Sequence, residues 1–228
     1  MVEGTIFQSR NFAEGDSLPR HILNLVTPLA IVLVFAGCRA TPSGYDPDPI
    51  DTSQDPVQEA LEDAPPMEVS RGGYDFVLTP KASYIIRGKV LGRENYHGGW
   101  NALLSPCDVA MAWGELLKGD LYKKLDWSQS GRWCFWQYGP GFTQSDSFVS
   151  RYSSNNHIIP ATKNVERAAK SLHAGYDAEL TGKLVFIKGK KGDFNCWWNS
   201  SLSRSDTGNG SCEVLYLERL KTKDYYYE

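Results

Sequence analysis

The apolar residues of this chain are distributed unevenly, and that distribution limits where a folded core can form. Among the first 75 residues the only apolar run is residues 22–38, which is too short and too interrupted for a comfortable membrane-spanning helix. Residues 76–228, in contrast, are long enough to bury about two thirds of the surface that their unfolded chain would expose. We therefore expect one globular domain over residues 76–228, which needs neither a metal ion nor a disulfide to fold.

The apolar run follows a basic residue, Arg20, and ends with two small residues before Cys38. This order resembles the bacterial lipobox, in which the cysteine is lipidated and becomes the mature N-terminus, although Phe35 stands where leucine is usual. The resemblance implies a lipoprotein-type signal peptide over residues 1–37 and a membrane anchor through lipid at Cys38. It also implies a place in the cell envelope facing the periplasm. The residue that follows the cysteine is Arg39 rather than aspartate. By resemblance to enterobacterial lipoproteins, this favours sorting to the outer membrane.

Residues 38–75 are rich in Pro, Asp, Ser, Gln and Glu, and we expect them to form a disordered acidic tether. Counted along the sequence, residues 39–75 carry two basic and nine acidic groups, whereas residues 76–228 carry twenty basic and fifteen acidic groups. A self-repelling, Pro-containing tether would let the domain stand off from the lipid headgroups. The small positive charge of the domain gives no reason to expect a nucleic-acid partner.

Local patterns predict the elements of the domain. Residues 82–92 have the β-branched and aromatic content of a strand, in which Gly88 indicates a bend or a bulge. Ser105-Pro106, with Asp108 completing a capping pattern, predicts an amphipathic helix over residues 106–118. The aromatic run 133–138 predicts a buried central strand.

A second helix is expected to begin at Thr162 and to end at Gly175. Strands over 177–188, 194–202 and 211–219 should follow. The resulting order predicts an α+β, mostly β fold, namely a small antiparallel Greek-key barrel of the OB type with two helices.

The cysteine spacing points to disulfides rather than to a metal site. Apart from Cys38 the chain has Cys107, Cys134, Cys196 and Cys212, which allow three pairings. We favour Cys196 with Cys212, because they lie on successive predicted strands. None of the spacings is a CxxC pair, so no metal is expected, and no motif indicates a cofactor.

Four short motifs carry a resemblance to a known family. They are Trp127–Ser130, Arg132–Trp133, His157–Pro160 and Ser200–Glu213. Over residues 84–217 the chain resembles a family of small uncharacterised bacterial envelope or secreted proteins with these motifs. The resemblance supports the domain boundaries and implies no activity.

Two functional interpretations remain open. In the first, Cys212 is a nucleophile, His157 is its base, and Asp206 or Asn156 orients the imidazole, as in a Cys/His hydrolase or acyltransferase. In the simpler interpretation, His157 caps neighbouring backbone groups, Cys212 packs in the barrel, and Arg204, Asp206 and Glu213 form a salt-bridge network.

A non-catalytic binding role is the leading expectation. Lys190, Trp197 and Trp198 lie within one predicted hairpin, and aromatic side chains beside basic ones are typical of OB-type ligand faces. Together with Arg204 in the following loop, they predict a site for cell-wall glycan or for an envelope protein. The chain is thus expected to be a binding or structural module of the cell envelope.

Overall fold

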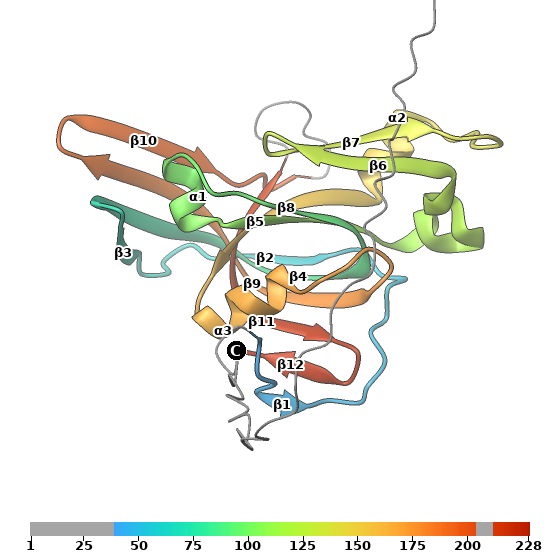
Figure 1. The fold of residues 1–228 in the computed structure, drawn as a ribbon, viewed down its shortest axis with the longest axis horizontal. Coiled ribbons are helices and arrows are strands. Elements are labelled where there is room, and N and C mark those ends of the chain that lie inside the picture. The colour runs from blue at the N-terminus through green and yellow to red at the C-terminus, as the bar shows by residue number, and fades with distance from the viewer. Residues whose placement is uncertain (1–38, 204–211) are drawn as a thin grey trace, which may run out of the picture. The chain divides into compact units, whose positions relative to one another are not determined.

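The computed structural model describes residues 39–203 and 212–228, which are mostly β structure with short helices around it (Figure 1). Ten of the strands form one mixed sheet, and β6 and β7 form a separate two-stranded sheet. The strands of the ten-stranded sheet are β1 (Gly44–Tyr45), β2 (Val57–Ala60), β3 (Met67–Arg71), β4 (Tyr74–Asn95), β5 (Cys107–Ala112), β8 (Ser153–Pro160), β9 (Asp177–Lys191), β10 (Phe194–Asn199), β11 (Glu213–Thr222) and β12 (Tyr225–Tyr227). The smaller sheet is the hairpin of β6 (Leu125–Ser130) and β7 (Trp133–Tyr138).

The described residues contain four helical segments, where two helices were predicted. They are α1 (Trp100–Leu104), the 3-10 segment η1 (Gly114–Lys124), α2 (Asp146–Arg151) and α3 (Lys163–Lys170). The helix predicted from Thr162 is α3, and the Thr162 hydroxyl accepts the Val165 N–H as its N-cap, although the helix ends before Gly175. None of these segments is long and apolar enough to cross a membrane.

Five strands pair in a closed cycle. β4 pairs with β5, β5 with β8, β8 with β11, β11 with β9, and β9 with β4. Only the β8–β11 pair is parallel, and this pair makes the sheet mixed. β4 and β9 are long enough to continue beyond the cycle, where β3 and β10 extend the sheet.

The interior of this cycle is apolar. Its fully buried side chains include Tyr84, Ile86, Val109, Ile158 and Leu215, and α3 covers one end with Val165 and Ala169. A second apolar cluster lies on the other side of β4 and β9, around Phe76, Leu78 and Ile187, and α1 contributes Leu104 to it. The sheet is therefore covered on both sides along much of its length.

The predicted helix over residues 106–118 is wrong, because residues 107–112 form the strand β5. All six of its side chains are buried. Cys107, Val109 and Met111 face the interior cluster, while Ala110 and Ala112 pack under η1 and the β6–β7 hairpin. Apart from Asp108 this strand is apolar, and an apolar strand buried on both faces satisfies a helical spacing by coincidence.

Residues 133–138 do form a strand, β7, but not a buried central one. Its Trp133 and Phe135 are 39% and 48% exposed, and its partner is only β6. Aromatic content indicated the strand correctly, whereas burial depends on which neighbours the strand finds.

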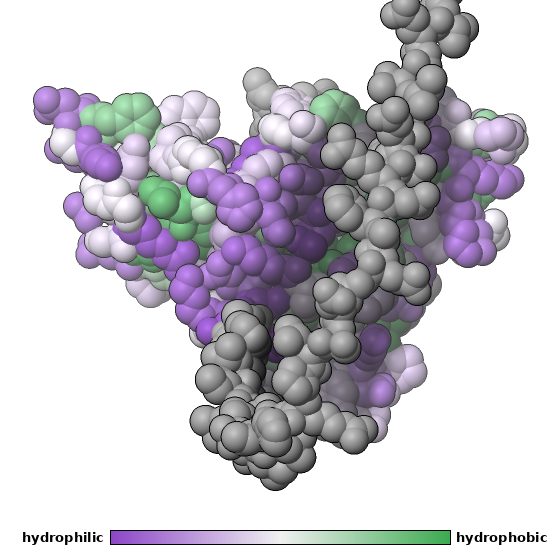
Figure 2. All heavy atoms as spheres, viewed as in Figure 1, coloured by the Kyte–Doolittle hydropathy of each residue, from purple (hydrophilic) through white to green (hydrophobic). Residues whose placement is uncertain are grey.

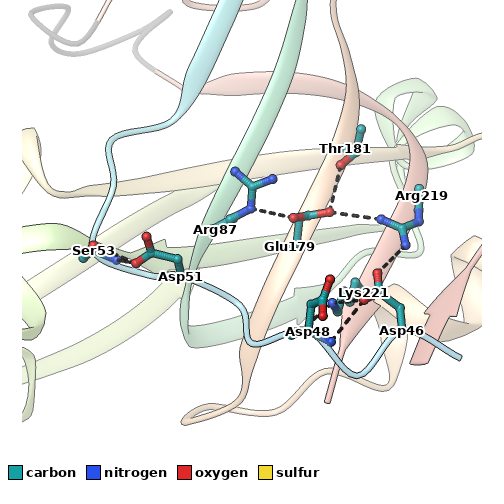
Figure 3. A network of polar contacts seen from close by, with 9 residues as sticks. All are labelled: Asp46, Asp48, Asp51, Ser53, Arg87, Glu179, Thr181, Arg219 and Lys221. Atoms are coloured by element: carbon teal, nitrogen blue, oxygen red, sulfur yellow. Dashed lines mark hydrogen bonds and ion pairs between the residues drawn. The ribbon is translucent and has the colours of Figure 1, made fainter. Parts of the chain in front are cut away.

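Residues 39–75, expected to be a disordered tether, instead belong to the folded unit and contribute β1, β2 and β3. Ion pairs hold this segment to the sheet (Figure 3). Lys221, whose side chain is 5% exposed, contacts Asp46 at 2.5 Å, and Arg219 contacts the other oxygen of Asp46 at 2.9 Å. Arg219 also binds Glu179, which pairs in turn with Arg87. Two of the acidic residues that suggested self-repulsion thus meet cations, Asp46 those of β11 and Asp55 that of Arg151 on α2.

Candidate functional site

The polar centre of the domain is Asp108, a fully buried carboxylate on β5. Its strand partner on β8 is His157, which is also buried, and Nδ1 of the imidazole lies 2.9 Å from Oδ1 of Asp108. The imidazole Nδ1 has no partner in hydrogen-bond geometry, so this contact is electrostatic. Arg132 contacts the same carboxylate oxygen at 2.7 Å. A buried carboxylate is therefore flanked by two groups that can carry positive charge.

Arg132 reaches Asp108 from the tip of the β6–β7 hairpin. Gly131 and Arg132 form the two-residue turn, both with positive φ (59° and 76°), a conformation that costs a non-glycine residue roughly 1–2 kcal/mol. The guanidinium also donates to the Ser105 backbone carbonyl and lies over the Tyr96 ring at 3.8 Å. The strained turn is thus held in place by contacts of its own side chain.

Amide side chains continue the network beside Asp108. Asn155 donates to the Arg132 carbonyl and accepts a hydrogen bond of 2.8 Å from Gln129. Next to this network, Gln129 and Cys134 help to line a small cleft of about 190 Å³ between the hairpin and β4. The Trp127–Ser130 and Arg132–Trp133 motifs therefore converge on the His157–Pro160 motif.

The β9–β10 hairpin brings two adjacent tryptophans to opposite faces of the sheet. Trp198 is partly buried, and its ring centroid lies 4.6 Å from that of His157, so it covers the Asp108 centre. Trp197 points the other way and is 71% exposed. The period of two along a strand explains why only one of the pair can be an exposed platform.

Trp197 shares its face with residues of three neighbouring strands, because paired residues in a sheet point to the same side. One cross-strand row is Val77, Lys188 and Trp197, and the next is Asp75, Lys190 and Asn195. We call these six residues the Trp197 face. Figure 2 shows hydrophobic residues among hydrophilic ones at the surface of this hairpin. Lys190 thus lies one cross-strand row from Trp197 on the same face, whereas Trp198 lies on the opposite face with His157.

The Ser200–Glu213 motif is described only at its two ends. Ser201 N–H donates to the Cys212 carbonyl, and the Ser200 hydroxyl accepts from the Val214 N–H. Glu213 begins β11 and is fully buried. Of the predicted site residues, Arg204 and Asp206 lie outside the described residues, as does Cys38.

The predicted Cys196–Cys212 disulfide is not present, because Cys196 is a free thiol. Cys107 and Cys134 are free thiols as well. Burial raises the pKa of the thiols of Cys107 and Cys134 to about 12 each, and it also raises the pKa of Cys196. Burial and the nearby Asp108 raise the pKa of Tyr96 to about 12.

Of the predicted catalytic residues, the structure describes His157 and Cys212 but not Asp206. β8 and β11 are parallel, with Val214 opposite His157, so Cys212 lies two residues before the partner of His157 along the neighbouring strand. Cys212 itself precedes β11, so the strand register does not fix the distance between its sulfur and the imidazole. Asp108, predicted from the sequence to cap a helix, lies beside the imidazole where Asp206 or Asn156 was expected.

Within residues 39–203 and 212–228, no group of three or more His, Cys, Asp or Glu side chains is arranged to hold a metal ion. Comparisons with protein-family models, with curated proteins and with solved structures found no match to this chain.

Proposed function

We propose that the domain is an OB-type Greek-key barrel. The closed cycle of β4, β5, β8, β11 and β9 supports this assignment, with its single parallel pair and with α3 between β8 and β9, which are the third and fourth of these strands along the chain. OB-type barrels bind ligands on their second and third strands and on the loops after the first and fourth. The corresponding parts of this chain are β5, β8, the 96–106 connection and the β10 region, and these meet around Asp108, on the side of β10 that carries Trp198 and not Trp197.

We further propose that the protein is a non-catalytic cell-envelope lipoprotein, anchored by lipid at Cys38 and facing the periplasm, that binds cell-wall glycan. The observation that carries the binding role is Trp197, an indole that is 71% exposed next to Lys188. An exposed indole is costly to leave in water and offers a flat apolar surface for a sugar ring. Lys188, Lys190 and Asn195 supply donors around it, and the lysines suit the carboxylates of a cell-wall polymer.

Co-sedimentation of the purified protein with peptidoglycan tests this proposal. Trp197→Ser and Lys190→Ser should each lower the bound fraction several-fold without changing the unfolding midpoint, because both side chains lie on the exposed face. Tyr45→Ser is the matched control, since Tyr45 is 65% exposed but lies on β1. Equal binding by the wild-type protein and all three variants would refute a role for the Trp197 face. Recovery of an envelope protein by cross-linking at Trp197 would identify that protein, rather than glycan, as the partner.

One observation favours a second candidate, a Cys/His-dependent hydrolase or acyltransferase. The Asp108 carboxylate lies 2.9 Å from His157 Nδ1, the ring atom that the orienting acid of a catalytic triad faces, and Cys212 is the candidate nucleophile. The test is the rate at which iodoacetamide alkylates Cys212 in the folded protein. If His157 activates the thiol, His157→Gln should slow alkylation at least tenfold at neutral pH, and an unchanged rate would eliminate this candidate.

A further inference from the structure

The chain is attached to the barrel almost immediately after Cys38. Ala40 packs against the main apolar cluster. The Thr41 N–H donates to Asn164 Oδ1 at 2.8 Å, and Asn164 Nδ2 donates back to the Thr41 carbonyl at 2.8 Å. Both polar groups of the Thr41 backbone are therefore tied to α3.

The contacts continue along the next residues. Ser43 N–H donates to the Tyr226 carbonyl at 2.8 Å, and the Ser43 hydroxyl accepts from the Glu228 N–H at 2.9 Å. Asp46 then forms its ion pairs with Lys221 and Arg219. No part of the stretch from Ala40 to Asp46 resembles a flexible tether.

This attachment limits how far the barrel can lie from a lipid on Cys38. Only Arg39 and Ala40 lie between Cys38 and Thr41, and three extended Cα-to-Cα steps span at most about 10 Å. We infer that the barrel rests directly against the lipid surface, with the end formed by β1, β12 and α3 toward the headgroups. The inference rests on the proposed lipidation of Cys38. In place of the long flexible tether expected from the sequence, it gives the domain a fixed orientation relative to the membrane.

The chemistry of this end suits a lipid headgroup layer. Tyr45 and Tyr225 form an edge-to-face pair with centroids 5.7 Å apart, and they are 65% and 44% exposed. Tyrosine is enriched where membrane meets water, because its ring is apolar and its hydroxyl is polar. Lys163, with a side chain that is 77% exposed, adds a cation, while Asp224 and Glu228 add negative charge, so the tyrosines carry the argument.

The same orientation positions the proposed ligand site. In Figure 1 the β6–β7 and β9–β10 hairpins lie at the end away from β1 and β12. With β1 and β12 at the headgroups, the hairpin that carries the Trp197 face lies at the end of the domain away from the lipid.

Photo-cross-linking of the full-length lipidated protein in phosphatidylethanolamine and phosphatidylglycerol vesicles tests this inference. A photoreactive phenylalanine analogue replaces Tyr45 or, as the matched control, Phe194, which is 51% exposed on β10. We expect several-fold more lipid adduct by mass spectrometry at position 45 than at position 194. A flexible Gly/Ser segment inserted between Arg39 and Ala40 should abolish that difference, because it restores a tether while keeping the anchor.

The possible outcomes distinguish the proposed orientation from the proposed lipidation of Cys38 and from the proposed glycan binding. Equal adduct yields at both positions in a protein whose Cys38 is shown to be lipidated would overturn the orientation and leave the anchor intact. If Cys38→Ala remains in the membrane fraction of cells, the anchor itself is wrong and the orientation falls with it. Neither result depends on glycan binding.

Discussion

Asp108 and His157 are paired in register on the neighbouring antiparallel strands β5 and β8, and their side chains meet at 2.9 Å in the interior of the protein. Arg132 adds a formal positive charge to the same carboxylate. Through Asp108, the Arg132–Trp133 motif is joined to the His157–Pro160 motif. The contact also ties the β6–β7 hairpin to the ten-stranded sheet, because Arg132 has no other carboxylate contact among the described residues.

Asp108→Asn should therefore destabilise the protein strongly. The change keeps the shape of the side chain but leaves the Arg132 cation, 13% exposed, without its counter-ion. Breaking a buried ion pair from one side costs about 3 to 5 kcal/mol. Denaturant unfolding measures the loss, with Asp126→Asn, an exposed carboxylate on β6, as the control. A loss equal to that of the control would mean that the network contributes no net stability.

The N-terminal segment should detach in acid. Hydrogen bonds from Lys221 and Arg219 lower the pKa of Asp46 to about 2 from an ordinary value of 3.8. Because the folded pKa is the lower one, Asp46 stabilises the fold fully above about pH 4, and this contribution disappears as the pH falls toward 2. Amide exchange of residues 43–48 should rise over that interval and, in Asp46→Asn, should already be high at pH 5.

Asp48→Asn is the matched control for this change, since Lys221 contacts the backbone carbonyl of Asp48 rather than its side chain. The control should keep the acid transition of the wild-type protein. If Asp46→Asn and Asp48→Asn behave alike, the ion pairs do not hold the segment.

The cysteines should differ in reactivity while the protein is folded. At pH 8 a thiol with a pKa near 12 is ionised in roughly one molecule in ten thousand, so Cys107 and Cys134 should be alkylated very slowly by iodoacetamide. Cys196, which is less buried, should react sooner. Peptide mapping before and after denaturation measures the difference. A Cys196–Cys212 disulfide-linked peptide from protein isolated from the envelope would contradict the thiol state described above.

What the sequence could predict depended on how local each signal was. Thr162 caps α3 through contacts within four residues, and the strands β9 and β10 are bounded by turn residues, so these elements were found. β5 was mistaken for a helix, because nothing local distinguishes a strand buried on both faces. Likewise, the cations that order residues 39–75 come from the far end of the chain, and composition alone could not indicate them.

Prediction of the candidate site was limited in the same way to local signals. His157, Arg132 and Trp198 stood out as motif or aromatic residues, but their common partner Asp108 was interpreted through its neighbours in the sequence. Only the register of β5 against β8 reveals that contact. The two faces of the β9–β10 hairpin also required the strand pairing, which separates Trp197 from Trp198.

Closure of the five-stranded cycle depends on Gly182, and Gly182→Ala tests this. Gly182 lies on β9 between Tyr84 of β4 and Leu217 of β11. A Cβ atom there would lie 2.0 Å from the Tyr216 carbonyl oxygen, which belongs to the backbone and cannot rotate away. The β9–β11 pairing must therefore open or shift, and we expect a loss of about 3 kcal/mol or more, at the upper end of what overpacking costs.

Gly98→Ala is the control for this variant, because no atom lies within 4 Å of its added Cβ and the substitution should leave unfolding unchanged. Amide exchange should locate the damage in Gly182→Ala along β9 and β11, while β5 and β8 keep more of their protection. If Gly182→Ala unfolds at the same denaturant concentration as Gly98→Ala, the two strands do not pack as closely as the structure requires. The cycle would then be open between β9 and β11, and the OB-type assignment would lose its main support.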